Sequence, residues 1–551
     1  MKPIFRSVLP LFASVIMALP VFGQPQQKQT SSKNWQNKSI ETDSVYGTGS
    51  DQALALLNAA GLKPQKVLVA VIDGGVYINH PDLKDHIWTN PKEIPNNHID
   101  DDKNGYVDDV HGWDFIGGKD SDINHENQEI TRVYRDLSKK YANANPAQMS
   151  KADKKEYNNY LKIKSEFETK RGTYEMQVKM LDKMVDGINK MKTAMGNKNF
   201  NAEQLKAYNP PADDSDLIKD KNRLSMTFQM LSLYMPNVTA DSLKVQLNEG
   251  VKQLNNYLLY DFNPDFNPRY IVGDNYADVT QRNYGNNDVV GPTDLHGTHV
   301  SGIIAGDRTG KAGAQEGIAD DAVIMAVRAV PDGDERDKDV ANAIRYAVDN
   351  GARVVNMSFG KPFGTNKDAV DDAVKYAEAH DVLLVHAAGN DHKDNDTTNN
   401  FPNRRFAGSH KQADNWLEVG ASDIHGNPGS FSNYGKKSVD LFSPGVKIYS
   451  TLPDTIFGYE SGTSMASPCA AGVACILREY FPSLSAKDIR KILMKSVTKI
   501  TFKVPMPGNG GLMVNYNDLC ISGGIINATK AVELALKKTG SKYHIVNPKK
   551  A

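Results

Sequence analysis

The second half of the sequence alternates between short apolar runs and longer helical patterns. The apolar runs are rich in β-branched residues and cover residues 322–327, 353–357 and 382–388. Each has the length of a buried strand. Helical patterns fill the intervals at residues 340–350 and 368–380. Because strands separated by helices pair in parallel through right-handed crossovers, we expect an α/β fold. Its sheet should be doubly wound and mainly parallel, with helices on both faces.

An earlier apolar run ends in a carboxylate. Residues 67–72 are continuously apolar, which is typical of a strand buried on both faces, and Asp73 follows them directly before two glycines. Open parallel sheets carry their chemistry at the carboxyl ends of their strands. Asp73 is therefore a candidate functional residue.

A histidine and a serine complete a possible catalytic set. His296 begins a stretch of small and apolar residues that predicts a buried helix, and Ser464 lies between a glycine turn and an alanine-rich helix. A Gly-Thr-Ser-Met run is by itself usually a turn and a helix cap. A serine hydroxyl becomes an effective nucleophile only when a base takes its proton. His299, three residues further along the same helix, is the competing base, and we expect it to pack inside.

The order Asp73, His296, Ser464 and the residues around them resemble the subtilisin-like serine peptidases, the subtilase family. The resemblance covers about residues 66–118 and 286–537. It implies that Ser464 attacks the carbonyl of a polypeptide substrate, that His296 transfers the proton, and that Asp73 orients the imidazole. The alternative is an exported, non-catalytic peptide-binding or folding-assistance protein on the same scaffold. The intact trio argues against that alternative.

Two further strand ends resemble the substrate-binding segments of this family. The segment 354–360 resembles the strand that pairs with the substrate main chain, which makes Ser358 and Gly360 binding candidates. The segment 387–390 resembles the wall of the first specificity pocket. Its candidates are Ala388, Gly389 and the oxyanion-hole residue Asn390. Ala-Ala-Gly-Asn alone is also an ordinary turn, so its position after an apolar strand carries the inference.

An acidic stretch at residues 100–109 indicates a cation site. Oxygen-bearing side chains at alternate positions, followed by Gly105, match the front half of an EF-hand-like calcium loop without its closing glutamate. Some subtilases carry a similar loop. We expect structural Ca²⁺ here rather than a solvated acidic turn. The candidate ligands are Asp100, Asp102, Asn104, Asp108 and Asp109.

A long insertion separates the candidate acid from the candidate base. His296 follows Asp73 by 223 positions, and apolar residues recur at helical spacing within the interval, from Tyr174 to Met195 and from Leu243 to Leu258. Pro210 and Pro264 interrupt these runs. We expect a subdomain of two to four helices at residues 119–285. A solvated helical surface is the simplest interpretation, and substrate gating or partner binding is the alternative.

The amino terminus predicts export. Lys2 and Arg6 precede an apolar stretch at residues 8–22, as in a secretory signal peptide, and no later stretch is long enough for a membrane span. We expect a periplasmic or secreted protein. The predicted segments are a signal peptide at 1–23, an N-terminal extension at 24–65, a catalytic domain at 66–118 and 286–540 around the insertion, and a tail at 541–551.

Composition limits the partners of the mature protein. With 65 basic and 66 acidic residues the net charge is −1, so we expect no nucleic-acid partner. Three cysteines without a spacing pattern argue against a disulfide framework. The polar residues 24–50 predict an extended or poorly ordered segment, and residues 51–60 predict a short amphipathic helix. The sequence leaves the oligomeric state open.

Overall fold

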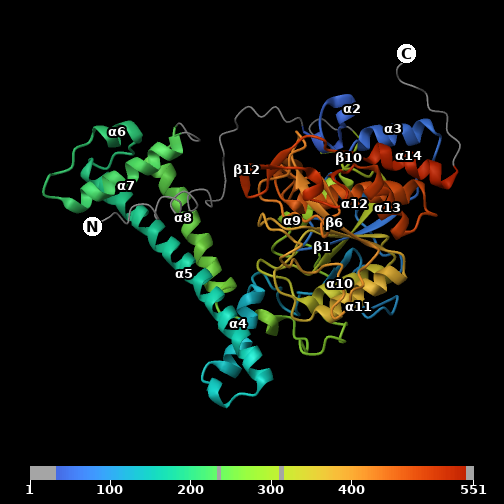
Figure 1. Cartoon of the computed structure of the whole chain (residues 1–551), viewed down its shortest axis with the longest axis horizontal. Helices are drawn as coiled ribbons and strands as arrows, with labels where there is room; N and C mark the ends of the chain where they lie inside the picture. The colour runs from blue at the N-terminus through green and yellow to red at the C-terminus, as the bar shows by residue number, and fades with distance from the viewer. Residues whose placement is uncertain (1–32, 233–236, 310–314, 541–551) are drawn as a thin grey trace. The chain divides into compact units, whose positions relative to one another are not determined.

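The computed structural model describes residues 33–232, 237–309 and 315–540 (Figure 1). These residues form two compact units. The helical unit comprises residues 130–266, and the sheet unit comprises residues 33–129 and 267–540. The predicted signal peptide and the predicted tail lie outside the described residues.

The sheet unit is built on nine strands in the order β10-β13-β7-β6-β5-β4-β1-β3-β2. All neighbouring strands are parallel except β10 and β13. The predicted mainly parallel α/β sheet is therefore confirmed. The strands are β1 (Val67–Asp73), β2 (Gly112–Asp114), β3 (Ala322–Arg328), β4 (Val354–Met357), β5 (Leu383–Ala387), β6 (Trp416–Ser422), β7 (Leu441–Pro444), β10 (Thr498–Lys499) and β13 (Gly524–Ile525). Two antiparallel hairpins join β8 (Ile448–Leu452) to β9 (Ile456–Glu460) and β11 (Val504–Met506) to β12 (Asn509–Val514).

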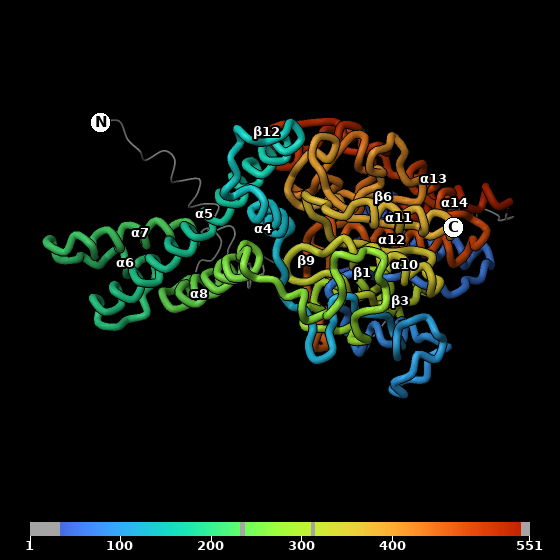
Figure 2. The backbone as a smooth tube through the Cα atoms, turned by 90° about the horizontal axis from the view of Figure 1, so that it is seen from below, coloured from blue at the N-terminus to red at the C-terminus, as the bar shows by residue number. Residues whose placement is uncertain are grey.

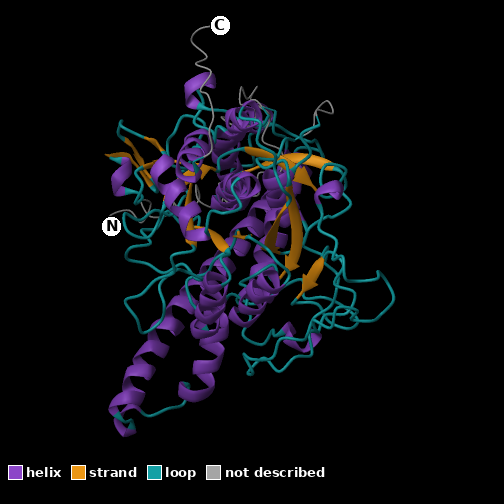
Figure 3. Ribbon diagram, turned by 90° about the vertical axis from the view of Figure 1, so that its right-hand side faces the viewer, coloured by secondary structure: helices purple, strands orange, loops and turns teal. Residues whose placement is uncertain are grey.

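Helices cover both faces of this sheet (Figures 1 and 3). On β1, Val67, Val69 and Val71 face one core, and Ala70 and Ile72 face the other. This alternation explains why the whole strand is apolar. The first core holds α3 (Ser50–Ala59), α9 (Leu295–Ala305), α12 (Thr463–Tyr480), α13 (Ala486–Ser496) and α14 (Ala528–Thr539), and the second holds α10 (Asp337–Asp349) and α11 (Lys367–Ala379). Short helices are α2 (Ile40–Asp43), η2 (Trp35–Asn37), η3 (Lys84–His86), η6 (Pro268–Ile271) and η7 (Tyr516–Asp518).

The N-terminal extension is more ordered than its composition predicts. Trp35 is only 1% exposed and belongs to the first core, and its indole nitrogen donates to the carbonyl of Lys447 at 3.1 Å. The amide of Ala528 donates to the carbonyl of Thr48 at 2.7 Å. The prediction of a poorly ordered segment is thus wrong from residue 33 onward, because one buried tryptophan and backbone hydrogen bonds outweigh the polar average. The predicted helix at 51–60 is confirmed as α3.

The helices of the helical unit lie side by side (Figures 2 and 3) and enclose an apolar core of their own. On α5, Leu181, Met184, Ile188 and Met191 are buried against α7 and α8, as the predicted stripe requires. The unit contains α4 (Glu129–Tyr141), α5 (Lys151–Ala194), α6 (Ala202–Ala207), α7 (Ser215–Ser232), α8 (Ala240–Asn256), the 3₁₀ turn η4 (Pro146–Gln148) and the π-helical turn η5 (Tyr257–Asp261). In the described part of the chain, no helix is long and apolar enough to cross a membrane.

The helical unit covers fewer residues than the predicted insertion of residues 119–285. The flanking residues belong to the sheet unit because buried ion pairs hold them there. Arg269 pairs with Asp339 at 2.6 Å, and Arg336 pairs with Glu126 at 2.7 Å. The described residues of the unit also form five α-helices rather than two to four. On α4, Ile130, Tyr134, Leu137 and Tyr141 form an apolar stripe that was not singled out in the sequence, whereas α6, at six residues, is too short to show one.

Candidate active site

Asp73 and His296 form the centre of the candidate site. His296 Nδ1 lies 2.8 Å from Asp73 Oδ1 and 2.9 Å from Oδ2, and the amide of Gly74 donates to Oδ1 at 2.8 Å. If Nδ1 were unprotonated, its lone pair would repel the carboxylate oxygens at these distances. Nδ1 therefore carries a proton and donates a hydrogen bond to the carboxylate of Asp73. This arrangement leaves Nε2 of the neutral ring as a proton acceptor. The Asp73 side chain is 4% exposed and that of His296 is 41% exposed.

A glycine allows this close approach of α9 to β1. A Cβ at Gly297 would lie 2.1 Å from the carbonyl oxygen of Gly75 and 3.0 Å from the Cβ of Asp73. No side chain fits there without moving one of the two backbones. Gly75 itself has a φ of 137°, which residues with a side chain rarely adopt. The glycines around Asp73 and His296 therefore permit the contact between the acid and the base.

The electrostatic surroundings of His296 favour its protonated form. Burial lowers the pKa of the imidazole, but the charge and hydrogen bond of Asp73, and then the charge of Glu460, outweigh this effect and raise it. Glu460 was not a sequence candidate. It lies at the end of β9, and only the packing of that strand brings it near His296.

His299 cannot serve as the base. It is fully buried, and its Nε2 lies 3.3 Å from the carbonyl oxygen of Gly458. Burial lowers its pKa to about 3, so the ring is neutral and closed to substrate. The expectation that His299 packs inside is confirmed.

Ser464 lies in the first turn of α12, near the positive end of the helix dipole. Its Oγ donates a hydrogen bond to the carbonyl of Ser358 at 3.0 Å. Among the described residues no hydrogen bond joins this hydroxyl to His296. Both residues belong to the sheet unit. The hydroxyl has to turn away from Ser358 before His296 can take its proton.

A proline explains the role of the Ser358 side chain. Pro468 has no amide hydrogen, so the helix supplies no i+4 donor to the carbonyl of Ser464. Ser358 Oγ donates to that carbonyl instead, at 2.9 Å, and Asn356 Nδ2 donates to Ser358 Oγ at 2.9 Å. Ser358 therefore positions the backbone of Ser464 through its side chain as well as its carbonyl.

Asn390 has the orientation that an oxyanion donor needs. Its Oδ1 accepts from the amide of Thr463 at 2.8 Å and from Thr463 Oγ1 at 3.0 Å. The opposite atom, Nδ2, donates to no other described residue. A Cβ at Gly462 would lie 3.5 Å from Nδ2 and 3.6 Å from the amide nitrogen of Ser464. Both nitrogen donors therefore border the same small space beside Gly462.

The predicted pocket wall is partly corrected. The Ala388 side chain is fully buried in a separate apolar cluster, so Ala388 cannot contact substrate through it. Its carbonyl is also occupied, since it accepts from the side-chain amides of Asn395, Asn400 and Asn433. The sequence did not single out these three asparagines, which lie far apart along the chain or in irregular loops.

The glycines of the two predicted binding segments are tightly packed. Gly389 has φ of 104°, and its amide donates to Thr463 Oγ1 at 3.1 Å. A Cβ at Gly360 would lie 2.4 Å from Asn400 Oδ1. Both glycines therefore bring their segments close to neighbouring backbone and amide groups.

The acidic loop gathers part of the predicted cation set. Carboxylate oxygens of Asp100, Asp102 and Glu93 lie within 4.8 Å of one another. Glu93 was not a sequence candidate, because it precedes the acidic stretch. Its Oε2 is buried without a hydrogen-bond partner in the described part of the chain. A buried, unpaired carboxylate oxygen beside two more carboxylates fits a hard cation such as Ca²⁺.

The other predicted ligands are engaged inside the loop. Asp108 accepts from the amides of Asn97 and His98 at 3.2 and 2.9 Å. Asp109 is fully buried and accepts from Tyr346 and from the side chain of Asn104. Its pKa is raised to about 6 by burial. Neither Asp108 nor Asp109 belongs to the cluster of Glu93, Asp100 and Asp102. Both act as hydrogen-bond acceptors within the loop, and Asn104 is turned toward Asp109.

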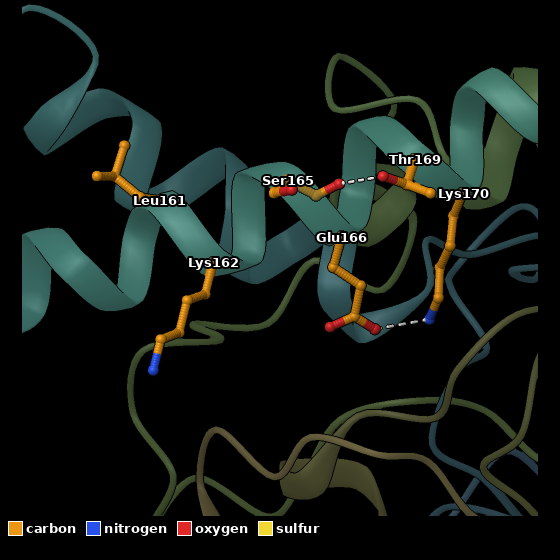
Figure 4. A pocket seen from close by; sticks show the side chains of 6 residues that line it. All are labelled: Leu161, Lys162, Ser165, Glu166, Thr169 and Lys170. Carbon is orange, nitrogen blue, oxygen red and sulfur yellow. Dashed lines mark hydrogen bonds and ion pairs between the residues drawn. The ribbon is translucent and has the colours of Figure 1, made fainter.

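A groove of about 620 Å³ lies elsewhere, on the surface of α5 (Figure 4). Its lining includes an ion pair of 3.0 Å between Lys170 and Glu166, one turn apart. The lining residues are Leu161, Lys162, Ser165, Glu166, Thr169 and Lys170. All six come from one helix, and the carboxylate of Glu166 is paired with Lys170 rather than with a hydroxyl, so nothing in this groove resembles the arrangement of Asp73 and His296.

Comparisons with known proteins find similar sequences in one family. Residues 247–516 match the model of the Subtilase family; the span includes His296 and Ser464 but not Asp73, which precedes the helical unit. The thermophilic serine proteinase of Bacillus sp. (strain AK1) is 37% identical over 241 residues, 43% of this chain and 54% of that protein. Subtilisin DY of Bacillus licheniformis is 33% identical over 208 residues, 37% of this chain and 71% of that protein. Thermitase of Thermoactinomyces vulgaris is 36% identical over 239 residues, 43% and 75% respectively.

Proposed function

This chain belongs to the subtilase family and is a serine peptidase, and we propose that it is an exported endopeptidase that cleaves polypeptides through an acyl-enzyme on Ser464. One observation carries the proposal. His296 Nδ1 contacts both oxygens of Asp73, at 2.8 and 2.9 Å, in the unit whose helix α12 begins at Thr463. Acyl transfer requires an imidazole that is oriented by a carboxylate and a serine that can act as the nucleophile, here at the start of a helix.

The first step is attack on the substrate carbonyl. Ser464 Oγ leaves the carbonyl of Ser358 and transfers its proton to His296 Nε2 as it bonds to the carbonyl carbon. The imidazole becomes positively charged. Asp73, which is 4% exposed, stabilises this charge without taking the proton. The raised pKa of His296 is consistent with this role.

The second step is collapse of the tetrahedral intermediate. Its oxyanion accepts hydrogen bonds from Asn390 Nδ2 and from the amide of Ser464, which border one space. His296 then gives its proton to the leaving nitrogen, and the peptide bond breaks. Water attacks the acyl-enzyme by the same route in reverse, with His296 again as base.

Labelling with a fluorophosphonate tests the nucleophile. We expect the wild-type protein to be labelled at one serine, Ser464→Ala to lose the label, and Asp73→Asn to react far more slowly. If the wild-type protein binds peptides but is not labelled, the result favours the non-catalytic peptide-binding alternative. Mass spectrometry of the labelled peptide identifies the serine.

We also propose that Glu93, Asp100 and Asp102 hold a structural calcium ion. The unpaired buried oxygen of Glu93 supports this proposal. When bound, the ion would neutralise carboxylates that otherwise repel one another. It takes no part in the reaction that we propose.

Export is proposed from the sequence of the amino terminus. A basic start followed by the apolar residues 8–22 is typical of a secretory signal peptide. Amino-terminal sequencing of the protein recovered from cell fractions tests this. A mature protein that begins near residue 24 outside the cytoplasm would support export, and an intact amino terminus in the cytoplasm would contradict it.

A further inference from the structure

The hairpin of β8 and β9 is fixed against the helix that carries His296. Ser450 Oγ donates to the carbonyl of His299 at 2.7 Å, and Thr451 Oγ1 donates to the carbonyl of Thr298 at 2.8 Å. On the second strand, the Gly458 carbonyl oxygen lies 3.3 Å from His299 Nε2. Both strands of the hairpin thus contact α9.

This packing brings Glu460 beside His296. Glu460 follows Gly458 by two positions and pairs with Ile448 across the hairpin, and the backbone carbonyls of both Gly458 and Ile448 interact with His299. His296 precedes His299 by three positions, so the two rings share one side of α9. The electrostatics agree with this geometry. Burial raises the pKa of Glu460 and the charge of His296 opposes that effect, while Glu460 contributes to the raised pKa of His296.

The backbone around Glu460 is rigid, but its carboxylate is free. Glu460 pairs with Ile448 across the hairpin, Ser461 Oγ accepts from the amide of Lys447 at 2.8 Å, and the amide of Gly462 donates to the carbonyl of Gly445 at 2.9 Å. Within the described ranges, the side chain of Glu460 forms no hydrogen bond or ion pair, and it is exposed. A fixed backbone therefore presents an unpaired carboxylate to whatever approaches His296.

The chemistry of His296 indicates which part of a substrate comes near. His296 gives its proton to the leaving nitrogen, so the imidazole faces the leaving half of the substrate. We propose that the Glu460 carboxylate binds a cationic side chain there, so that Lys or Arg is preferred as the first residue after the cleaved bond. This inference rests on the proposed peptidase function. A carboxylate without a partner gains a charge-assisted hydrogen bond from such a side chain.

Matched peptides test the inference. The peptides share one acyl half and carry Lys, Gln or Glu directly after the cleaved bond. For the wild-type enzyme we expect kcat/KM to be roughly tenfold higher for Lys than for Glu. Glu460→Gln should bring this ratio close to one, and Glu460→Lys should invert it. Asp454→Asn is the control, since it removes a carboxylate from the turn of the same hairpin at a φ of 58° that asparagine tolerates. It should keep the wild-type ratio.

The outcomes separate this inference from the proposed function. If Glu460→Gln leaves the Lys-to-Glu ratio unchanged, the inference is wrong. A common change in kcat/KM for all three peptides would then mean that Glu460 acts only through His296, and no change at all would mean that it has no role in catalysis. Fluorophosphonate labelling of Ser464 is measured in parallel. Labelling with cleavage but without charge preference contradicts only the role of Glu460, whereas absence of both labelling and cleavage contradicts the peptidase function itself.

Discussion

Two substitutions of Asn390 distinguish the roles of its side-chain oxygen and its side-chain nitrogen. Oδ1 accepts from the amide and hydroxyl of Thr463, and Nδ2 is the proposed oxyanion donor. Asn390→Leu removes both functions. Asn390→Asp removes the donor but keeps an acceptor for Thr463. The two variants therefore share a catalytic defect and differ in stability.

The magnitudes follow from these contacts. Loss of one oxyanion donor costs about 10²–10³ in kcat, or roughly 2.7–4 kcal/mol, with KM nearly unchanged. Thr463 is only 1% exposed, so Leu leaves a buried amide without an acceptor. That loss costs about 1–3 kcal/mol of folding stability. Asp keeps the acceptor, but its charge repels the oxyanion, which adds up to about 4 kcal/mol to the barrier for charges about 4 Å apart near a protein surface.

The assay is steady-state hydrolysis of a peptide amide together with thermal unfolding. We expect kcat to fall in the order wild type, Asn390→Leu, Asn390→Asp, and the melting temperature to fall only for Asn390→Leu. Ser464→Ala, which has no acyl-enzyme route, sets the background. If both variants keep kcat within about threefold of wild type, Asn390 is only a turn residue and the reasoning from its orientation fails.

Two further predictions concern stability. Calcium added to chelator-treated protein should raise the melting temperature by mass action, and Glu93→Gln should reduce this rise more than Asp108→Asn, because only Glu93 belongs to the carboxylate cluster; equal rises in all three proteins would contradict the site. Glu479 on α12 is 1% exposed, and burial, with Asp321 and Asp320, raises its pKa well above 4.5. Because the folded pKa exceeds the unfolded one, stability should be fully present below about pH 4.5 and fall by about 1.4 kcal/mol per pH unit until the folded pKa is passed. Urea denaturation at several pH values should show a shallower loss for Glu479→Gln, and parallel curves would refute this account.

Much of the fold follows from local patterns in the sequence. A run such as residues 67–72 is apolar at every position because both of its faces are buried, and this is visible without knowing its neighbours. The stripe on α5 is visible for the same reason. Asp73, His296 and Ser464 could be proposed as candidates because each lies at the end of such an element, in a short segment rich in small residues.

Only the tertiary structure decided which polar groups meet. Glu93 joins Asp100 and Asp102, Asp109 is buried, and Glu460 lies close enough to His296 to influence its charge. No pattern in the sequence indicates these outcomes, since each depends on how a loop or hairpin packs against a distant element. The burial of Ala388 and of Trp35 has the same cause. The periodicity of apolar residues indicates which face of a segment is buried. Which residues contact that face depends on packing across the whole unit, so it cannot be predicted from any single segment.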